Sequence, residues 1–222
     1  MPLKLIATPI GNPGDITLRA IEELRNADLV IGEETAEVSK LMKRLGLAEK
    51  KLDRLNEHSD ERDIAFLLEE CRTKNVALVS DCGTPGFCDP GSRLVLACRN
   101  AKIPVTTLPG ASSLMCILSL SALNVREFLF LGFLPAEREA RGLALRKLKQ
   151  EPRTVVVMDT PYRMAKLMSE LAQVLPDRRA LLGMDLTLEN ETVLDGRLKD
   201  LAPQTEGKKA EFILLIYGTQ SV

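Results

Sequence analysis

Hydrophobic positions along the chain form short apolar runs that alternate with stripes of helical spacing. In the first half, the runs typical of buried strands span residues 3–7, 29–32, 76–79 and 105–108. Between them, apolar residues recur at helical spacing, for example at Leu18, Ile21 and Leu24. Strands that alternate with helices in this way predict a largely parallel sheet that is covered on both faces.

The second half starts with the same alternation and then changes. A charged helix is predicted over residues 138–149, between strand-like runs at 128–133 and 154–158. After Pro176, three strand-like runs follow with little helix between them, at residues 180–186, 191–194 and 211–217. This half therefore predicts a mixed sheet with an antiparallel portion. We predict two α/β domains, residues 1–120 and 121–222, with a ligand cleft between them.

Composition narrows the function classes. The 222 residues include 30 Lys and Arg against 31 Asp and Glu, which argues against a protein that coats nucleic acid by bulk attraction. An apolar fraction of 45% excludes a disordered chain. The longest apolar runs are far shorter than the roughly 20 residues that cross a bilayer, so we expect a cytoplasmic protein without membrane contact. Five cysteines without a C-x-x-C pair indicate reduced thiols, and no metal site is expected.

Three loops that follow predicted strands are candidates for chemistry, because open parallel sheets bind ligands beyond the carboxyl ends of their strands. Residues 11–15 can bring backbone N–H groups close to an anion, or can be a plain tight turn. Residues 80–91 hold three Gly, two Pro and two Asp, a density that a connector does not need. Asp81 and Asp89 there can bind ribose hydroxyls or cap a helix. In residues 109–113, Ser112 can likewise be a helix cap.

These loops carry a family resemblance. A-T-P-I-G-N-P-G-D-I-T-L-R-A, V-A-L-V-S-D-C-G-T-P-G-F-C-D-P-G, L-P-G-A-S-S and F-L-F-L-G-F-L-P resemble the tetrapyrrole methylase superfamily, and within it the ribosomal RNA small-subunit methyltransferase I branch. The resemblance implies an S-adenosylmethionine-dependent methyltransferase, a homodimer with the cofactor between two α/β domains. It implies these cofactor-binding residues: Gly83, Thr84, Pro85, Gly86, Ser112, Ser113, Met158, Thr160, Met184 and Leu186. It also implies that the acceptor faces a loop containing Pro9, Gly11, Asn12, Pro13 and Gly14.

Two departures from the branch leave the acceptor open. The branch has E-D-T-R where this chain has E-E-T-A, so Ala36 replaces the arginine. Leu188 replaces the lysine of the branch's L-T-K segment. A cation is the natural partner of a phosphate or a developing alkoxide. The leading hypothesis is methylation of a ribose 2′-hydroxyl of small-subunit ribosomal RNA. The alternatives are a tetrapyrrole or other small-molecule acceptor, and a catalytically silent homologue that binds cofactor or RNA.

A ribose hydroxyl gains from a general base, and RNA needs phosphate contacts. The candidate bases by residue type and loop position are Asp15, Glu33, Glu34, Asp81 and the single histidine, His58. Capping is the structural alternative for Asp15 and Glu34. Residues 138–153 carry six basic against two acidic side chains, which makes Arg138 and Arg141 candidates for phosphate contacts. A solvated helix face accounts for such a run equally well.

Overall fold

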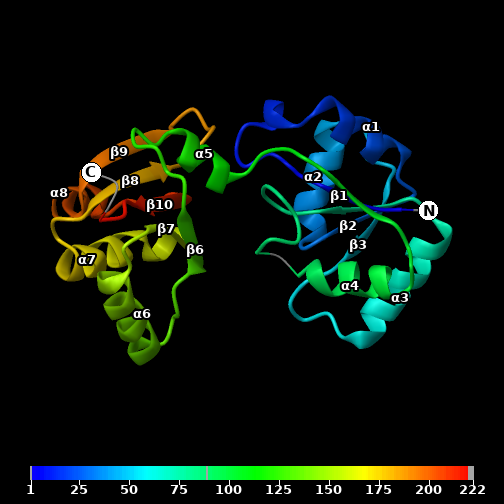
Figure 1. The fold of residues 1–222 in the computed structure, drawn as a ribbon. Coiled ribbons are helices and arrows are strands. Elements are labelled where there is room, and N and C mark those ends of the chain that lie inside the picture. Colours follow the sequence, from blue (N-terminus) through cyan, green and yellow to red (C-terminus); the bar gives the residue numbers. More distant parts are fainter. Residues whose placement is uncertain (1, 89, 220–222) are drawn as a thin grey trace. The chain divides into compact units, whose positions relative to one another are not determined.

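The computed structural model describes residues 2–88 and 90–219 and divides into two compact units, Met1–Ser112 and Ser113–Val222 (Figure 1). The sequence placed this division near residue 120, after the helix α5 (Ser113–Ser119), which belongs to the second unit in the structure. Asp89, one of the two loop aspartates considered above, lies outside the described residues. Within the described residues, no helix is both long and apolar enough to span a bilayer.

The first unit is a five-stranded sheet in the order β3-β2-β4-β1-β5, with every neighbouring pair parallel. Its strands are β1 (Leu3–Ile6), β2 (Leu29–Gly32), β3 (Lys51–Arg54), β4 (Val76–Val79) and β5 (Val105–Leu108). Its helices are η1 (Pro13–Asp15), α1 (Leu18–Asn26), α2 (Thr35–Arg44), α3 (Glu61–Thr73) and α4 (Ser92–Asn100). The parallel sheet predicted from the apolar runs is confirmed.

Helices cover both faces of this sheet. The stripe of Leu24 on α1 packs with Val38 and Met42 of α2 on one face, and Leu67 of α3 packs with Leu94 of α4 on the other. Figure 1 shows these two helix pairs on opposite sides of the strands. Because both faces are buried, β2 and β4 contain no polar side chain, and β1 contains one, Lys4, which forms an ion pair with Glu23. The edge strand β3 was not predicted, since Lys-Leu-Asp-Arg contains no apolar run.

The second unit is a mixed sheet in the order β6-β7-β10-β8-β9. Only β6 and β7 pair in parallel, and the other three pairings are antiparallel. Its strands are β6 (Phe128–Phe133), β7 (Thr154–Asp159), β8 (Arg179–Met184), β9 (Thr192–Arg197) and β10 (Phe212–Ile216). Its helices besides α5 are α6 (Arg138–Gln150), η2 (Pro161–Arg163), α7 (Met164–Val174), α8 (Leu198–Leu201) and η3 (Ala202–Thr205). The predicted mixed sheet is confirmed.

The core of the second unit forms where α6, α7 and α8 pack on the sheet. Leu145 of α6, Leu167 of α7 and Leu198 of α8 share one cluster with the apolar strands β7, β8 and β10. A Cβ at Gly183 on β8 would lie 3.2 Å from Cδ1 of Ile117, so α5 packs closely against this strand. The predicted strand 180–186 ends earlier, at Met184, because Asp185 has a φ of 49° and leaves the extended region.

Candidate active site

Three loops meet at one edge of the first sheet. Strand β1 lies between β4 and β5, and Ile6 stands opposite both Val79 and Leu108. Because the three strands are parallel and in this register, the loops that follow them start at the same level. We call this edge the carboxyl edge; it contains all three of the loops that the sequence singled out.

Hydrogen bonds connect these loops. The backbone N–H of Thr8 donates to the carbonyl of Gly83 at 2.9 Å, and the Thr8 hydroxyl donates to the carbonyl of Ser80 at 3.0 Å. The Thr84 hydroxyl donates to the carbonyl of Ala111 at 3.2 Å. Thr8 is only 2% exposed, so its bonds are protected from water. The carboxyl edge is therefore a cross-linked platform rather than three independent loops.

Glycine is required at two positions of this platform. Gly83 has a φ of +84°, and a Cβ there would lie 3.3 Å from Ile10 Cγ2. At Gly110 a Cβ would lie 2.8 Å from the Cβ of Ala7, closer than real Cβ contacts. Both glycines let neighbouring segments pack closely, Gly83 against Ile10 and Ala111, and Gly110 against Ala7. A larger residue at either position would push the loops of the platform apart.

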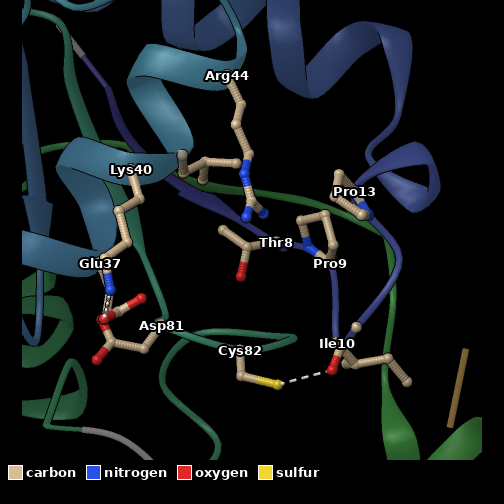
Figure 2. Close-up of a pocket in the computed structure, with 11 residues that line it drawn as sticks. Thr8, Pro9, Ile10, Pro13, Glu37, Lys40, Arg44, Asp81 and Cys82 are labelled. Carbon is tan, nitrogen blue, oxygen red and sulfur yellow. Dashed lines mark hydrogen bonds and ion pairs between the residues drawn. The ribbon is translucent and has the colours of Figure 1, made fainter. Parts of the chain in front are cut away.

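A pocket of about 260 Å³ opens beside the platform (Figure 2). Of the predicted acceptor loop, Pro9, Gly11 and Pro13 line it. Asn12 and Gly14 are not among its lining residues: the Asn12 side chain accepts a hydrogen bond from the Gly14 N–H at 2.9 Å and caps η1. The tight-turn interpretation thus applies to these two residues, and the binding interpretation stays open for the other three.

The candidate bases are spread over the carboxyl edge. Asp81 lines the pocket, and its carboxylate accepts a hydrogen bond from the Glu34 N–H at 3.2 Å, since β2 lies beside β4. Glu33 lines a second cavity of about 510 Å³ that includes Asn56. Neither the side chain of Asp15 nor the 81% exposed side chain of His58 lines either cavity. Among the five, only Asp81 is both in the pocket and on the glycine-rich loop.

The predicted cofactor residues of the second unit also gather at one edge of their sheet. Asp159 of β7, which follows Met158, and Met184 of β8 both stand opposite Phe212 of β10. Thr160 follows directly as the residue before η2, and Leu186 follows two residues after β8 ends.

Leu186 lies between two left-handed residues, Asp185 and Thr187, with φ values of 49° and 68°. The loop holds this conformation by hydrogen bonds from the Thr187 N–H to Glu191 at 2.6 Å and from the Glu211 N–H to Asp185 at 3.0 Å. Burial and the charge of Asp185 raise the pKa of Glu211. Backbone in this region is costly for residues other than glycine and is concentrated at functional sites.

Arg141 does not occupy the surface position expected of an RNA contact. Its side chain is 5% exposed and donates from Nε to Glu170 at 2.6 Å and from Nη1 to Asp159 at 3.2 Å, while its buried Nη2 has no hydrogen-bond partner among the residues that the structure describes. Burial alone would lower the pKa of the guanidinium, but Glu170 and Asp159 outweigh burial and raise it. The position of Arg141 gives no support to the prediction that it binds substrate, because the guanidinium is buried in ion pairs with Asp159 and Glu170 of the same unit.

The rest of the basic run divides into paired and unpaired side chains. Arg153 forms a bidentate pair with Glu151, at 2.7 and 3.0 Å, which lowers the pKa of Glu151 to about 2. Arg138, Arg146, Lys147 and Lys149 are exposed, and none forms an ion pair with a described residue. The local excess of positive charge is thus smaller on the surface than in the sequence.

The pocket contains two cations that the sequence did not single out. Lys40 and Arg44 of α2 line it together with Glu37 (Figure 2). The available signal was their spacing of four residues, which places them on one helix face next to the E-E-T-A motif. Among the described residues, no group of three His, Cys, Asp or Glu side chains could hold a metal ion.

Comparison with known proteins places this site in context. The profile of the family "Tetrapyrrole (Corrin/Porphyrin) Methylases" matches residues 2–202. The chain is 40% identical to "Ribosomal RNA small subunit methyltransferase I" of Micromonospora olivasterospora, over 98% of this chain and 70% of the relative. It is 37% identical to the protein of the same name from Leptospira biflexa, over 96% of this chain and 90% of the relative.

Two solved structures share the fold. A diphthine synthase superposes with a TM-score of 0.77 at 19% identity, covering 98% of this chain and 90% of that one. A uroporphyrin-III-C-methyltransferase from Thermus thermophilus superposes with a TM-score of 0.65 at 23% identity, covering 97% of this chain and 94% of that one. At such identities the likeness concerns the fold alone.

Proposed function

The chain belongs to the tetrapyrrole methylase family, and on this premise we propose that it methylates a ribose 2′-hydroxyl of small-subunit ribosomal RNA. It is a methyltransferase that uses S-adenosylmethionine as methyl donor. Relatives named for action on ribosomal RNA align over nearly the whole chain, which supports RNA as the acceptor class. The observation that carries the proposal is that Asp81, a pocket carboxylate, heads the loop that holds Gly83 and Gly86.

The residues of the platform fit the cofactor. S-adenosylmethionine presents a flat adenine, ribose hydroxyls, and an amino acid end with both charges. Gly83 and Gly86 have φ values of +84° and +78°, which give the loop a backbone shape that other residues rarely adopt, and the exposed Thr84 adds a hydroxyl. We propose that residues 83–86 bind the cofactor with Ser112, and that Ser113, Met158, Thr160, Met184 and Leu186 of the second unit contribute to the same binding.

For this reaction the protein must align the acceptor oxygen with the methyl group and provide one proton acceptor. S-adenosylmethionine supplies a methyl group on a sulfonium, which an acceptor oxygen takes by in-line displacement. Asp81 accepts the proton of the hydroxyl, since it lines the pocket that Pro9, Gly11 and Pro13 also line. The hydrogen bond from the Glu34 N–H fixes the direction of this carboxylate. Asp15, Glu33 and Glu34 remain weaker candidates for the base, because their side chains do not line this pocket.

A small-molecule acceptor is the second candidate, and it is favoured by the substitutions at Ala36 and Leu188. Leu188 is 40% exposed where the branch has a lysine, so this position offers no charge to a phosphate. A tetrapyrrole would not need the phosphate contact. A silent homologue is the third candidate, with the same two residues as its support.

One assay separates the candidates. Small ribosomal subunits from a strain without the gene are incubated with the purified protein and tritiated S-adenosylmethionine. We expect label in the RNA, and we expect the labelled nucleotide to survive alkaline hydrolysis joined to its 3′ neighbour, because a 2′-O-methyl group prevents attack on the phosphodiester. Label in a mononucleotide would indicate a base as acceptor, and absence of label in RNA would favour the small-molecule candidate.

Cofactor binding is the prior control. Calorimetry is expected to detect binding of S-adenosylmethionine to the protein alone, and failure to bind would refute the methyltransferase assignment in this chain. Binding without turnover on any acceptor would support the silent homologue.

We also propose that the protein is a cytoplasmic homodimer, as the ribosomal substrate and the family suggest. Light scattering coupled to size-exclusion chromatography is expected to give twice the chain mass of 24.5 kDa.

A further inference from the structure

The pocket of about 260 Å³ lies wholly within the first unit. It is bounded by the loop after β1, by one face of α2, and by Asp81 and Cys82 after β4 (Figure 2). Its volume is below the roughly 300–1,000 Å³ of pockets that enclose a cofactor-sized ligand. The space is of the right order for one sugar with its phosphate, the part of the RNA acceptor that must enter the site.

Of the two cations in this pocket, Arg44 is the one that is available to bind an anion. It is exposed, it lines the pocket, and it forms no ion pair with any residue that the structure describes. Figure 2 shows its side chain extending from α2 toward Thr8 and Pro9. A guanidinium presents donors in a planar fork that matches two phosphate oxygens, which an ammonium does not. The structure thus places a phosphate-binding group at the mouth of the proposed acceptor site.

Lys40 lies one turn before Arg44 and already has a partner. Its ammonium contacts the Glu37 carboxylate at 2.6 Å, an exposed pair three residues apart. Pairs of this kind contribute little stability, so Lys40 can exchange Glu37 for a phosphate at small cost. Glu37 and Asp81 also line the pocket, so its formal charge is zero, and the attraction for a phosphate comes from direct contact with Arg44 and not from a positive field of the whole pocket.

Lys40 and Arg44 lie on the same face of α2 as Ala36, which replaces the arginine of the family motif. Ala36, Lys40 and Arg44 are four residues apart and therefore lie along one face of α2. Lys40 and Arg44 thus lie about one and two helical turns after Ala36, the position at which the branch has the arginine of E-D-T-R. The charge that the sequence comparison found missing is present further along the same helix face.

We propose that Arg44, assisted by Lys40, binds a backbone phosphate of the RNA acceptor. This inference rests on the proposed function and names the group that positions its substrate. The 2′-hydroxyl of a ribose sits on the carbon next to the one that bears the 3′-phosphate. Fixing that phosphate at Arg44 therefore restricts where the hydroxyl can lie, and Asp81 in the same pocket is the proton acceptor within that range.

The test compares Arg44→Gln with Lys43→Gln, a matched change of an exposed cation on the same helix that does not line the pocket. The KM for small ribosomal subunits and the Kd for single-stranded RNA from the methylated region are measured over a salt series. We expect Arg44→Gln to raise both by about tenfold. We expect its salt slope to fall by about 0.7, the value for one phosphate contact on a single strand. Arg44→Lys is expected to lie between Arg44→Gln and the wild type.

The affinity for S-adenosylmethionine, measured by calorimetry, is expected to stay within about twofold in all three variants, which shows that the fold is intact. If Arg44→Gln and Lys43→Gln have equal KM and equal salt slopes, the phosphate site is refuted while the proposed function stands. If the wild type binds the RNA without methylating it, the proposed function fails and the same Kd comparison still decides the phosphate site. If the wild type binds no RNA, both fail.

Discussion

The carboxyl edge of the first sheet and the helix α6 both attracted notice in the sequence, the first by its glycines and the second by its positive charge. In the structure they differ in kind. Thr8 and Thr84 join the loops of the carboxyl edge by hydrogen bonds, and a pocket opens beside them. On α6, Arg141 is buried in an ion-pair network within the unit. Density of charge along a sequence is therefore a poorer guide to a binding surface than the convergence of loops.

The strongest test of the carboxyl edge is Asp81→Asn. The amide oxygen can still accept the Glu34 N–H, so the loop should keep its conformation. Loss of the proton acceptor is expected to lower kcat by about 10²–10⁴-fold, with unchanged affinity for S-adenosylmethionine. Single-turnover methylation measures the effect. Glu33→Gln is the control and should change kcat by less than about threefold; a variant Asp81→Asn that keeps half of the wild-type rate would remove Asp81 from the mechanism.

The buried network of α6 predicts a loss of stability instead of activity. Arg141→Ala removes one of the two guanidinium partners of the buried Asp159 carboxylate and leaves Arg163 at 3.6 Å and the Thr160 N–H at 2.9 Å. Breaking a buried pair from one side costs about 3–5 kcal/mol, and because Asp159 keeps these partners we expect a loss near the lower end of this range in the free energy of unfolding in urea. The exposed Arg138→Ala is the matched control, with an expected change within about 0.5 kcal/mol. A stable Arg141→Ala variant with weakened RNA binding would reverse our interpretation of this residue.

A pair of glycine substitutions contrasts the two regions directly. In Gly110→Ala the new Cβ would lie 2.8 Å from Ala7, so the platform must shift, and we expect S-adenosylmethionine to bind about tenfold more weakly. In Gly142→Ala, within α6, the nearest atom is Arg146 Nη1 at 3.9 Å. Alanine should stabilise that helix by about 0.5–1 kcal/mol without affecting cofactor binding. Calorimetry and urea unfolding measure both, and equal cofactor affinities would show that the platform tolerates the shift.

The smallest expected effect concerns Arg138, the basic residue of α6 that remains a candidate for RNA contact. It is exposed and forms no ion pair with a described residue. An exposed phosphate contact in high dielectric contributes little, so Arg138→Ala should weaken RNA binding by about twofold to threefold. Fluorescence anisotropy at low salt is the measurement. A loss larger than that of Arg44→Gln would make α6 the main RNA contact and would invert the comparison.

Much of the fold was accessible from the sequence because strands buried on both faces are rich in apolar residues. The runs at β2 and β4 are the clearest, whereas β1 contains Lys4 and the edge strand β5 contains two exposed threonines; the mixed character of the second sheet follows from the spacing of strands after Pro176. The polar edge strand β3 was missed, since one of its faces needs no apolar residues. The end of β8 was placed too late, because the sequence around Asp185 does not indicate that this residue has a left-handed backbone conformation.

For the site, the sequence by itself determined the family, the cofactor and the loops on which the chemistry depends, because glycine, proline and threonine at fixed spacing encode backbone geometry locally. Only the tertiary structure separated Arg141, which points into the core, from Arg44, which lines the pocket. It also showed that Asp81, and not Asp15, Glu33 or Glu34, lines this pocket, which residue type alone did not reveal. The physical reason is that the surroundings of a side chain depend on strand order and helix packing, which bring together residues far apart in the chain.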